Sequence, residues 1–513
     1  MPTGAEESGQ KVATPGIGTG NNETGSVVEA LPPVLVRTEW NGVAIDSREV
    51  QPGDLFVALP GEHVDGHTFV GDALRRGAAA ALVRSDWALS QAAALDLPVN
   101  IVAGSSVTEL TAPALIAVAD PLQTLQAWAA YHRARFDLPV IGITGSVGKT
   151  STKELLAAVL SERLVTLASV KSFNNEIGLP LTLLRLRPDH QAAVLEMGTY
   201  GPGDIALLCR LARPQYGIEL NVGPSHLERM QTLETVARAK AELVEALPSG
   251  GLAILNGDDP RVRAMRERTN ARTVFFGLDP TNDIWADKVE SHGLHGITFT
   301  VHVQGEERTI ELPLLGRHHV YTALPVIAVA RELGLPWTAI EGGLRSLKES
   351  PRLIIRQGIN GSTLLDDTYN ASPVSCQAAL DVLAEMPGRH VAVFGDMAEL
   401  GPEEIPGHRA VGRAAAGVVD LLVVVGEKAR HTGEAAMEAR HGQVPEICFA
   451  ASNGEASTLL RERIRSNDYI LVKGARVAAT EEIVASLRAD DMHIQREHDD
   501  GHPLSEEVRG ETV

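Results

Sequence analysis

Short hydrophobic runs alternate with helically spaced apolar residues through most of the chain. Between residues 120 and 348, four runs predict β-strands, at residues 140–143, 192–196, 253–255 and 274–276. Short apolar runs bounded by turn residues are typical of buried strands, and the stretches between them carry the helical period. Strands that alternate with helices form mostly parallel sheets covered on both faces. We therefore predict a mostly parallel α/β domain over residues 120–348.

The segments on either side of this block repeat the pattern on a smaller scale. After residue 349, three apolar runs each lead into a Gly-containing turn, at residues 390–394, 421–425 and 469–472. They predict a doubly wound, Rossmann-like domain over residues 349–490. Residues 39–119 combine short apolar runs with a helical stretch at 69–77 and a strand at 80–83, which predicts a small α/β domain. The expected fold is α/β with three domains.

The two ends of the chain differ from these blocks. Residues 1–38 are rich in Gly, Thr, Glu, Asn and Pro, and they predict a disordered extension. Residues 491–513 hold clustered acids and scattered His, and they predict a solvated acidic tail. The total of 513 residues agrees with three domains at roughly 150 residues each.

Composition and charge exclude several classes of protein. The net charge of −20 argues against a protein that binds nucleic acid through a general basic surface. No apolar run approaches the roughly 20 residues of a membrane span, and no basic start followed by an apolar block marks a secretory signal. The three cysteines lie far apart, without the spacing of a disulfide framework or a zinc site. We expect a cytoplasmic enzyme.

The strongest motif lies at residues 138–154. An apolar run leads into Gly145-Ser-Val-Gly148-Lys149-Thr150, and apolar residues then recur at helical spacing. A glycine loop before a helix N-terminus cradles phosphates, the lysine can reach the β- and γ-phosphates, and the threonine can hold Mg²⁺. The general pattern requires Gly at position 143, where Ile143 stands, and the glycine is at Gly142 instead. A plain strand, turn and helix is the simpler alternative. The loop predicts a nucleotide site, but it does not fix the reaction.

Potential metal or substrate ligands follow the loop in a fixed order. Glu196 ends an apolar run, so we expect its carboxylate at the C-terminal edge of the sheet, where open α/β sheets bind ligands. His226 closes a second apolar run, and Lys240 follows fourteen residues later. Each residue alone is more often structural. Their order behind the phosphate loop favours a shared site.

At these residues the chain resembles the ATP-dependent Mur ligases of peptidoglycan synthesis. Their loop, Gly-x-Thr-Gly-x-x-Gly-Lys-Thr, matches residues 142–150 with its shifted glycine, and their Glu, His and Lys match Glu196, His226 and Lys240. The resemblance extends from about residue 43 to 487. Further motifs are similar to the branch that adds D-Ala-D-Ala, namely Asn174-Asn175-Glu-Ile-Gly178, Asp366-Asp367-Thr-Tyr369-Asn370, Gly395-Asp-Met-Ala-Glu399-Leu-Gly401 and Lys473-Gly-Ala-Arg476.

The resemblance implies a ligase that uses ATP and Mg²⁺ to join D-Ala-D-Ala to a UDP-N-acetylmuramoyl-tripeptide through an acyl phosphate. It implies a monomer in which residues 39–119 bind the UDP-linked substrate, residues 120–348 bind ATP and residues 349–490 complete the ligase site. The implied catalytic residues are Lys149, Glu196, His226 and Lys240. The implied nucleotide contacts are Gly145, Ser146, Val147, Gly148, Lys149, Thr150, Ser151, Asn256, Arg352 and Asp367. The implied substrate contacts are Ser47, Arg48, Asn174, Asn175, Tyr369 and Asn370. The implied Mg²⁺ ligands are Thr150, Glu196, His226 and Lys240, the last as a carbamate.

The chain departs from the family pattern at a few positions. Where the family usually has Gly-x-His-Asn-x-x-Asn, this chain has Gly316-Arg-His318-His319-Val-Tyr-Thr322. Ser372 stands in place of the usual Asn and Ala475 in place of the usual Ser, which bears on the dipeptide pocket.

Other functions also fit the phosphate loop. A sibling amide ligase or a folylpolyglutamate synthetase would use a different acceptor, a phosphotransferase would leave phosphate on its acceptor, and a regulatory protein would bind nucleotide without catalysis. The sequence leaves open whether the third residue of the tripeptide is diaminopimelate or lysine.

Overall fold

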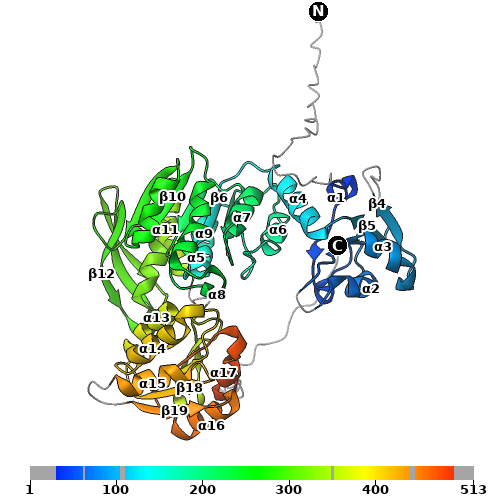
Figure 1. Ribbon diagram of the computed structural model, residues 1–513. Helices are drawn as coiled ribbons and strands as arrows, with labels where there is room; N and C mark the ends of the chain where they lie inside the picture. Colours follow the sequence, from blue (N-terminus) through cyan, green and yellow to red (C-terminus); the bar gives the residue numbers. More distant parts are fainter. Residues whose placement is uncertain (1–30, 62–63, 104–109, 348–351, 440–444, 490–513) are drawn as a thin grey trace, which may run out of the picture. The chain divides into compact units, whose positions relative to one another are not determined.

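The computed structural model describes residues 31–61, 64–103, 110–347, 352–439 and 445–489. By its internal contacts the chain divides into two compact units between Thr124 and Leu125, within helix α4 (Pro121–Arg133). One sheet belongs to the first unit and two sheets belong to the second (Figure 1). These three sheets confirm the predicted three-domain α/β class, and the exact domain boundaries stay a prediction.

The first unit is built on a five-stranded parallel sheet. Its strands run in the order β1-β2-β3-β5-β4. Its strands are β1 (Val43–Ala44), β2 (Leu55–Val57), β3 (Ala80–Arg84), β4 (Asn100–Ala103) and β5 (Ala114–Val118), and its helices are α1 (Pro33–Arg37), α2 (Val70–Arg75) and α3 (Ser85–Gln91). The predicted helix and strand at 69–77 and 80–83 are confirmed as α2 and β3.

The predicted disordered extension is too long at its C-terminal end. Residues 33–37 form helix α1, with a proline in its first turn and with Val34 and Leu35 buried. Burial of these two apolar side chains orders a segment that the composition of its neighbours had marked as disordered. Residues 1–30 and the predicted acidic tail at 491–513 lie outside the described residues.

The central sheet has nine strands in the order β14-β13-β12-β11-β10-β9-β6-β8-β7. The strands are β6 (Val140–Thr144), β7 (Thr166–Ala168), β8 (Ala192–Glu196), β9 (Tyr216–Glu219), β10 (Leu252–Asn256), β11 (Arg272–Gly277), β12 (Ile284–Ser291), β13 (Ile297–Val303) and β14 (Glu306–Leu312). The helices are α5 (Lys149–Ser161), α6 (Gly178–Leu183), α7 (Asp204–Ala212), α8 (Leu227–Met230), α9 (Leu233–Glu245), α10 (Pro260–Ala264), α11 (Val320–Glu332) and α12 (Trp337–Ser346). From β7 to β12 the neighbouring strands are parallel, which confirms the prediction.

Helices cover both faces of the central sheet (Figure 1). Helices α5, α11 and α12 pack on one face, and α7 and α9 pack on the other. The antiparallel strands β12 to β14 were not predicted. β12 alternates between buried and partly exposed positions, β14 is mostly exposed, and polar residues interrupt β13, so these strands lack the continuous apolar runs of β6 and β8.

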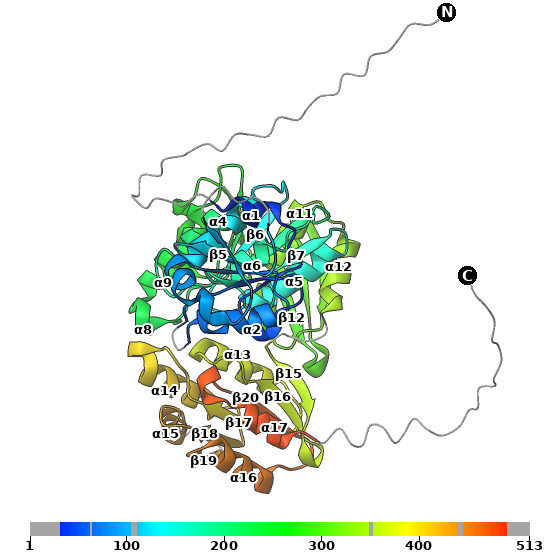
Figure 2. The ribbon, with the colours of Figure 1, turned by 90° about the vertical axis from the view of Figure 1, so that its right-hand side faces the viewer.

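The C-terminal sheet has six strands in the order β15-β16-β20-β17-β18-β19, all parallel except the edge strand β15 (Figure 2). The strands are β15 (Ile354–Gln357), β16 (Thr363–Asp367), β17 (Arg389–Gly395), β18 (Leu421–Val425), β19 (Glu446–Ala450) and β20 (Asp468–Lys473). The helices are α13 (Pro373–Ala384), α14 (Glu404–Ala415), α15 (Arg430–Glu438), α16 (Asn453–Arg463) and α17 (Glu481–Leu487). The three predicted strands are confirmed as β17, β18 and β20.

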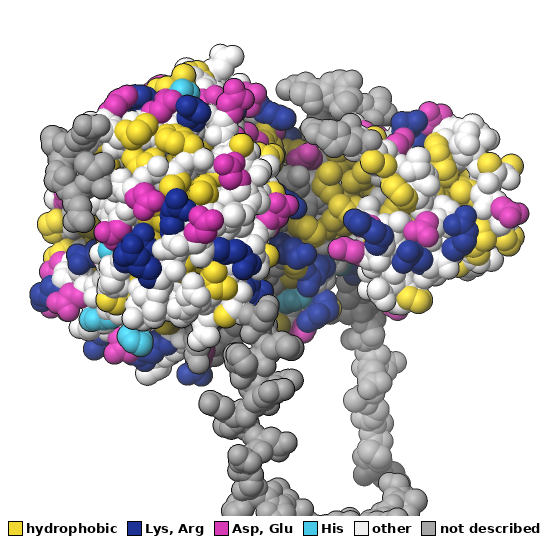
Figure 3. Space-filling model, turned by 90° about the horizontal axis from the view of Figure 1, so that it is seen from below, with side chains coloured by type: hydrophobic (Ala, Val, Ile, Leu, Met, Phe, Trp, Pro, Cys, Tyr) yellow, Lys and Arg dark blue, Asp and Glu magenta, His cyan; other side chains and the backbone are white. Residues whose placement is uncertain are grey.

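The surface carries charges of both signs. In the view of Figure 3, Lys and Arg side chains are interspersed with Asp and Glu side chains. Among the helices that the structure describes, none has the length and apolarity needed to cross a bilayer.

Candidate functional site

The loop between β6 and α5 has the backbone of a phosphate cradle. Gly145 and Gly148 have φ values of +152° and +89°, which side-chain-bearing residues rarely adopt. A Cβ atom on Gly145 would also lie 2.8 Å from Leu220 Cβ, so only glycine fits there. The Asn221 side chain fixes the loop, because its Oδ1 accepts from Val147 N at 2.9 Å and its Nδ2 donates to Val147 O at 3.0 Å.

The N-terminus of α5 is open to an anion. Gly148 stands at its N-cap, and no side chain of the described residues caps this thirteen-residue helix. Lys149 Nζ lies over the loop and donates to Gly145 O at 2.7 Å. Uncapped N–H groups, the helix dipole and a lysine ammonium together favour a bound phosphate. The loop therefore fits the phosphates of a nucleotide.

Glu196 and Asn174 lie together at the C-terminal edge of the central sheet. Glu196 is 1% exposed, and its Oε1 accepts from Asn174 Nδ2 at 2.7 Å. Its Oε2 has no hydrogen-bond partner among the described residues. A buried carboxylate oxygen without a partner is costly unless a ligand satisfies it, so this atom suits a cation. Asn175 instead accepts from Gly178 N at 2.9 Å at the start of α6.

Glu219 also reaches this edge, although the sequence motifs did not single it out. It ends β9, is 0% exposed, and has no hydrogen-bond partner for either carboxyl oxygen among the described residues. Burial raises the pKa of Glu219 to about 8, although the charges of Lys240 and Lys149 oppose this effect. The signal in the sequence is an acid inside an apolar run, between Ile218 and Leu220.

Lys240 projects from α9 into the same region and is 2% exposed. Burial lowers the pKa of Lys240 to about 7, the positive charge of Lys149 adds to this effect, and the charge of Glu219 opposes it. An amine with this pKa is largely neutral near pH 8, which is the form that reacts with CO₂ to give a carbamate. The lysine therefore fits the carbamylation implied by the family resemblance.

His226 lies at the N-cap of α8 and contacts the C-terminal domain. Its Nδ1 hydrogen-bonds Glu399 Oε2, and the edge of its ring meets the Tyr200 ring with centroids 4.8 Å apart. Among the described residues, no three His, Cys, Asp or Glu side chains are grouped so that they could hold a metal ion. A divalent ion at this site would therefore need further ligands, such as Thr150, a modified lysine, water or phosphate.

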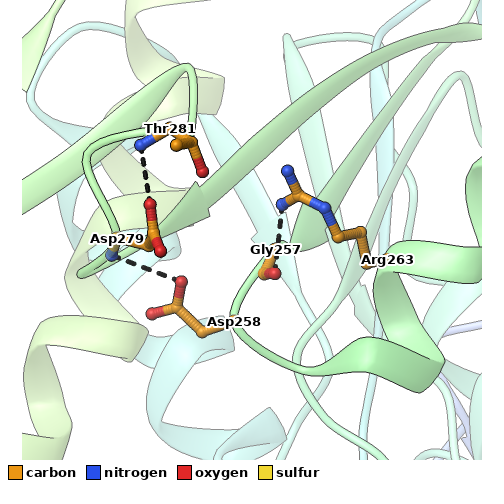
Figure 4. A pocket seen from close by; sticks show the side chains of 5 residues that line it. All are labelled: Gly257, Asp258, Arg263, Asp279 and Thr281. Atoms are coloured by element: carbon orange, nitrogen blue, oxygen red, sulfur yellow. Dashed lines mark hydrogen bonds between the residues drawn. The ribbon is translucent and has the colours of Figure 1, made fainter.

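A pocket with a volume of about 460 Å³ lies beside β10. Its lining residues are Gly257, Asp258, Arg263, Asp279 and Thr281 (Figure 4). Asn256 lies just before it and braces the loop, since its Nδ2 donates to Leu220 O at 2.8 Å and its Oδ1 accepts from Asp258 N at 3.0 Å. Asn256 is one of the nucleotide contacts that the family resemblance implies.

The segment that departs from the family motif reaches this pocket through Tyr321. Tyr321 Oη donates to Asp258 Oδ2 at 2.8 Å. His319 is buried, and its Nδ1 lies 3.4 Å from Thr322 Oγ1. The histidine and threonine that replace two amides thus contact each other, and Tyr321 provides the polar link to the pocket.

The start of the C-terminal domain meets the phosphate loop. Arg352 Nη2 donates to Thr150 Oγ1 at 3.0 Å, and its guanidinium lies 3.7 Å from the centre of the Tyr369 ring. Asp367 forms a buried ion pair with Lys473, whose Nζ lies 2.6 Å from Asp367 Oδ2 and also donates to Asn370 O at 2.8 Å. The structure therefore brings Arg352, Tyr369, Asp367 and Asn370 to one side of the site. The carboxylate of Asp367 is already paired with Lys473.

Family models match three successive segments of the chain. They are described as Mur ligase family, catalytic domain (residues 39–129), Mur ligase middle domain (residues 143–330) and Mur ligase, glutamate ligase domain (residues 351–476). Over 502 residues the chain is 36% identical to the UDP-N-acetylmuramoyl-tripeptide–D-alanyl-D-alanine ligase of Mycobacterium tuberculosis, with 91% of this chain and 96% of that relative covered. This chain belongs to the Mur ligase family. The resemblance drawn from the motifs is confirmed.

Solved structures of Mur ligases share the fold. The crystal structure of MurF from Acinetobacter baumannii is 30% identical, with a TM-score of 0.75 over 88% of this chain and 94% of that chain. MurF ligase from Thermotoga maritima in complex with ADP is 28% identical, with a TM-score of 0.71 over 88% of this chain and 97% of that chain. The α/β architecture of this Mur ligase is therefore that of its family.

In the first unit of this Mur ligase, the two residues expected to bind the UDP-linked substrate differ in exposure. Ser47 is buried, whereas the Arg48 side chain is 81% exposed and donates to the Asp46 carboxylate from Nε at 2.9 and 3.1 Å and from Nη2 at 2.6 Å. Nearby, His67 donates from Nδ1 to Asp65 at 2.6 Å and accepts at Nε2 from Arg84 N at 3.0 Å. The Arg48 guanidinium is exposed but paired with Asp46, so a diphosphate would compete with that carboxylate, whereas His67 is committed to the fold.

Proposed function

We propose that this Mur ligase joins D-Ala-D-Ala to a UDP-N-acetylmuramoyl-tripeptide at the expense of ATP. The observation that carries the proposal is the likeness to a UDP-N-acetylmuramoyl-tripeptide–D-alanyl-D-alanine ligase over 91% of the chain, in a structure that keeps an open phosphate loop and the family's Glu, His and Lys. We propose further that the enzyme acts in the cytoplasm as a monomer.

ATP use is supported by the loop and by the ADP complex of the Thermotoga maritima enzyme. The phosphates would lie on the N-terminus of α5, in contact with Lys149. Nucleotide contacts are proposed for Gly145, Ser146, Val147, Gly148, Lys149, Thr150, Ser151, Asn256, Arg352 and Asp367. The pocket of Figure 4 follows Asn256 directly and would receive the base and ribose side of the nucleotide.

Mg²⁺ fits the donor set at this edge of the sheet. Thr150, Glu196, His226 and a carbamylated Lys240 would hold it, and Glu196 Oε2 is the buried oxygen that lacks a partner among the described residues. When bound, Mg²⁺ supplies positive charge that offsets the negative charge of the reacting phosphate.

The reaction has two steps, and both involve the terminal carboxylate of the tripeptide. The terminal carboxylate of the tripeptide attacks the γ-phosphorus of ATP, which forms an acyl phosphate and releases ADP. The amine of D-Ala-D-Ala then attacks the acyl carbon, which forms the amide and releases phosphate. Both steps bring anions together in a protein of net charge −20, so local cations must hold them. Lys149 and Arg352 lie at the loop to provide this charge.

Substrate contacts are proposed on both sides of the loop. Asn174 lies against Glu196, and Tyr369 Oη lies 3.1 Å from Ser172 Oγ. Both would line the approach to the phosphates. Asn175 and Asn370 lie beside them. Ser47 and Arg48 are proposed for the UDP portion.

A phosphate-release assay tests the function. We expect release only when ATP, UDP-N-acetylmuramoyl-tripeptide and D-Ala-D-Ala are all present, and mass spectrometry should find the pentapeptide product. The Lys149→Ala variant should release none, and the exposed Lys288→Ala variant should match the wild type. Release that ignores the dipeptide, or a stable phosphorylated acceptor, would contradict the proposal.

A further inference from the structure

His226 of the central domain contacts Glu399 of the C-terminal domain. His226 Nδ1 hydrogen-bonds Glu399 Oε2, and Glu228 N donates to Glu399 O at 3.3 Å. The backbones approach so closely that a Cβ atom on Gly401 would lie 2.9 Å from Glu228 N. The two residues are 173 positions apart in the chain, so only the folded protein brings them together.

Both partners have a backbone conformation that residues other than glycine rarely adopt. His226 has φ +52° and ψ +31°, and Glu399 has φ +60°. Each such residue costs about 1 kcal/mol or more, and strained residues of this kind cluster at functional sites. The strain lies in the two residues whose side chains meet, which indicates that their orientation matters.

The imidazole ring of His226 is held on several sides. Tyr200 meets it edge to face at 4.8 Å, and the Arg229 guanidinium lies 5.3 Å from the Tyr200 ring centre. A cavity of about 190 Å³ opens beside the pair and is lined by His226, Glu228, Arg229 and Glu399. The ring is therefore fixed while one face of the contact stays accessible.

The carboxylate decides which ring nitrogen carries the proton. An ionised carboxylate only accepts hydrogen bonds, so His226 Nδ1 must donate to Glu399, which leaves the lone pair on Nε2. A histidine that binds a metal through one nitrogen almost always donates from the other to a carboxylate or a carbonyl. Glu399 supplies that partner, and it comes from a different domain.

We propose that Glu399 is a positioning residue that fixes the tautomer and orientation of His226, so that His226 becomes a competent ligand only when the central and C-terminal domains are in contact. The inference rests on the proposed function, since it assigns the partner of one residue of that same site. The hydrogen bond between His226 and Glu399 would therefore make metal binding depend on the contact between the two domains.

The test compares Glu399→Gln with Glu403→Gln, which changes an exposed glutamate four residues away. In ¹⁵N-histidine spectra of the free enzyme, assigned with His226→Gln, the wild type should show His226 protonated at Nδ1. Glu399→Gln should lose part of this signature, because the amide can donate to Nδ1 as well as accept from it, and Glu403→Gln should keep it in full. Mn²⁺ binding, measured by electron paramagnetic resonance with β,γ-imido-ATP present, should weaken about 10-fold in Glu399→Gln alone.

Kinetics separate this inference from the proposed function. We expect kcat of Glu399→Gln to fall about 10- to 100-fold while KM for D-Ala-D-Ala stays within twofold of the wild type. An unchanged tautomer and unchanged Mn²⁺ affinity would overturn the inference, even if kcat fell, because Glu399 would then act elsewhere. A wild-type enzyme that releases phosphate without the dipeptide would instead overturn the proposed function.

Discussion

Replacing Glu219 with glutamine should stabilise the protein near neutral pH. Glu219 is 0% exposed, and neither carboxyl oxygen has a hydrogen-bond partner among the described residues. Burial raises its pKa from 4.5 to about 8. Between these values the folded protein binds a proton that the unfolded chain releases, so the free energy of unfolding falls as the pH rises from about 4.5 to 8.

The size of the effect follows from the pKa. Each pH unit above 4.5 lowers the free energy of unfolding by about 1.4 kcal/mol. Relative to low pH, the wild type therefore loses about 3 kcal/mol of unfolding free energy at pH 7 and less than about 1 kcal/mol at pH 5. Glutamine has a similar shape and does not titrate in this range. The Glu219→Gln variant should therefore match the wild type near pH 5 and exceed it by about 3 kcal/mol at pH 7.

Denaturant unfolding of the nucleotide-free protein at pH 5, 6, 7 and 8 measures this difference. The Glu267→Gln variant is the control, because Glu267 is an exposed glutamate of the same domain. It should match the wild type at every pH. The reasoning would be refuted if the Glu219→Gln variant and the wild type had the same unfolding free energy at pH 8. It would also be refuted if the advantage of the variant over the wild type were smaller at pH 8 than at pH 5.

Three further predictions concern lysines. The Lys149→Met variant should bind ADP about 10- to 100-fold more weakly by calorimetry, because it loses a charged hydrogen-bond donor at the phosphates, and Lys288→Met should bind normally. The Lys240→Ala variant should lose ligase activity and regain part of it with added acetate or formate in a phosphate-release assay; an active variant would argue against the carbamate. The Lys473→Met variant should lose about 3–5 kcal/mol of unfolding free energy, since it leaves Asp367 buried without its ion-pair partner, and the Asp367→Asn/Lys473→Met double variant should recover most of it.

The sequence predicted most of the buried strands because their apolar runs are continuous. The run at 192–196 coincides with β8 and the run at 421–425 coincides with β18. Strands β12 to β14 were not predicted because polar residues within them break their apolar runs. Helix α1 escaped because two buried apolar side chains order it within a polar stretch.

The candidate site was predictable where a motif sets local geometry. The loop around Lys149 adopts the expected glycine conformations and leaves the helix N-terminus uncapped by any described side chain. Contacts that depend on tertiary packing were not predictable from spacing. The bond between His226 and Glu399 joins two domains, and Asp367 is paired with Lys473 from a strand about a hundred residues later.

Strand order explains how Glu219 joins the site and what its burial does there. β6 lies between β8 and β9, so Lys149, on the loop that follows β6, comes near both Glu196 and Glu219, and both acids raise the pKa of Lys149 against the effect of its burial. A carboxyl with a pKa of about 8 is mostly neutral at pH 7 and adds little repulsion to bound phosphates. Above pH 8 it ionises, so ADP affinity of the wild type should fall about 10-fold more between pH 7 and pH 9 than that of Glu219→Gln, a loss of about 1.4 kcal/mol. Equal pH dependence of the two proteins by calorimetry would show that Glu219 does not sense the nucleotide.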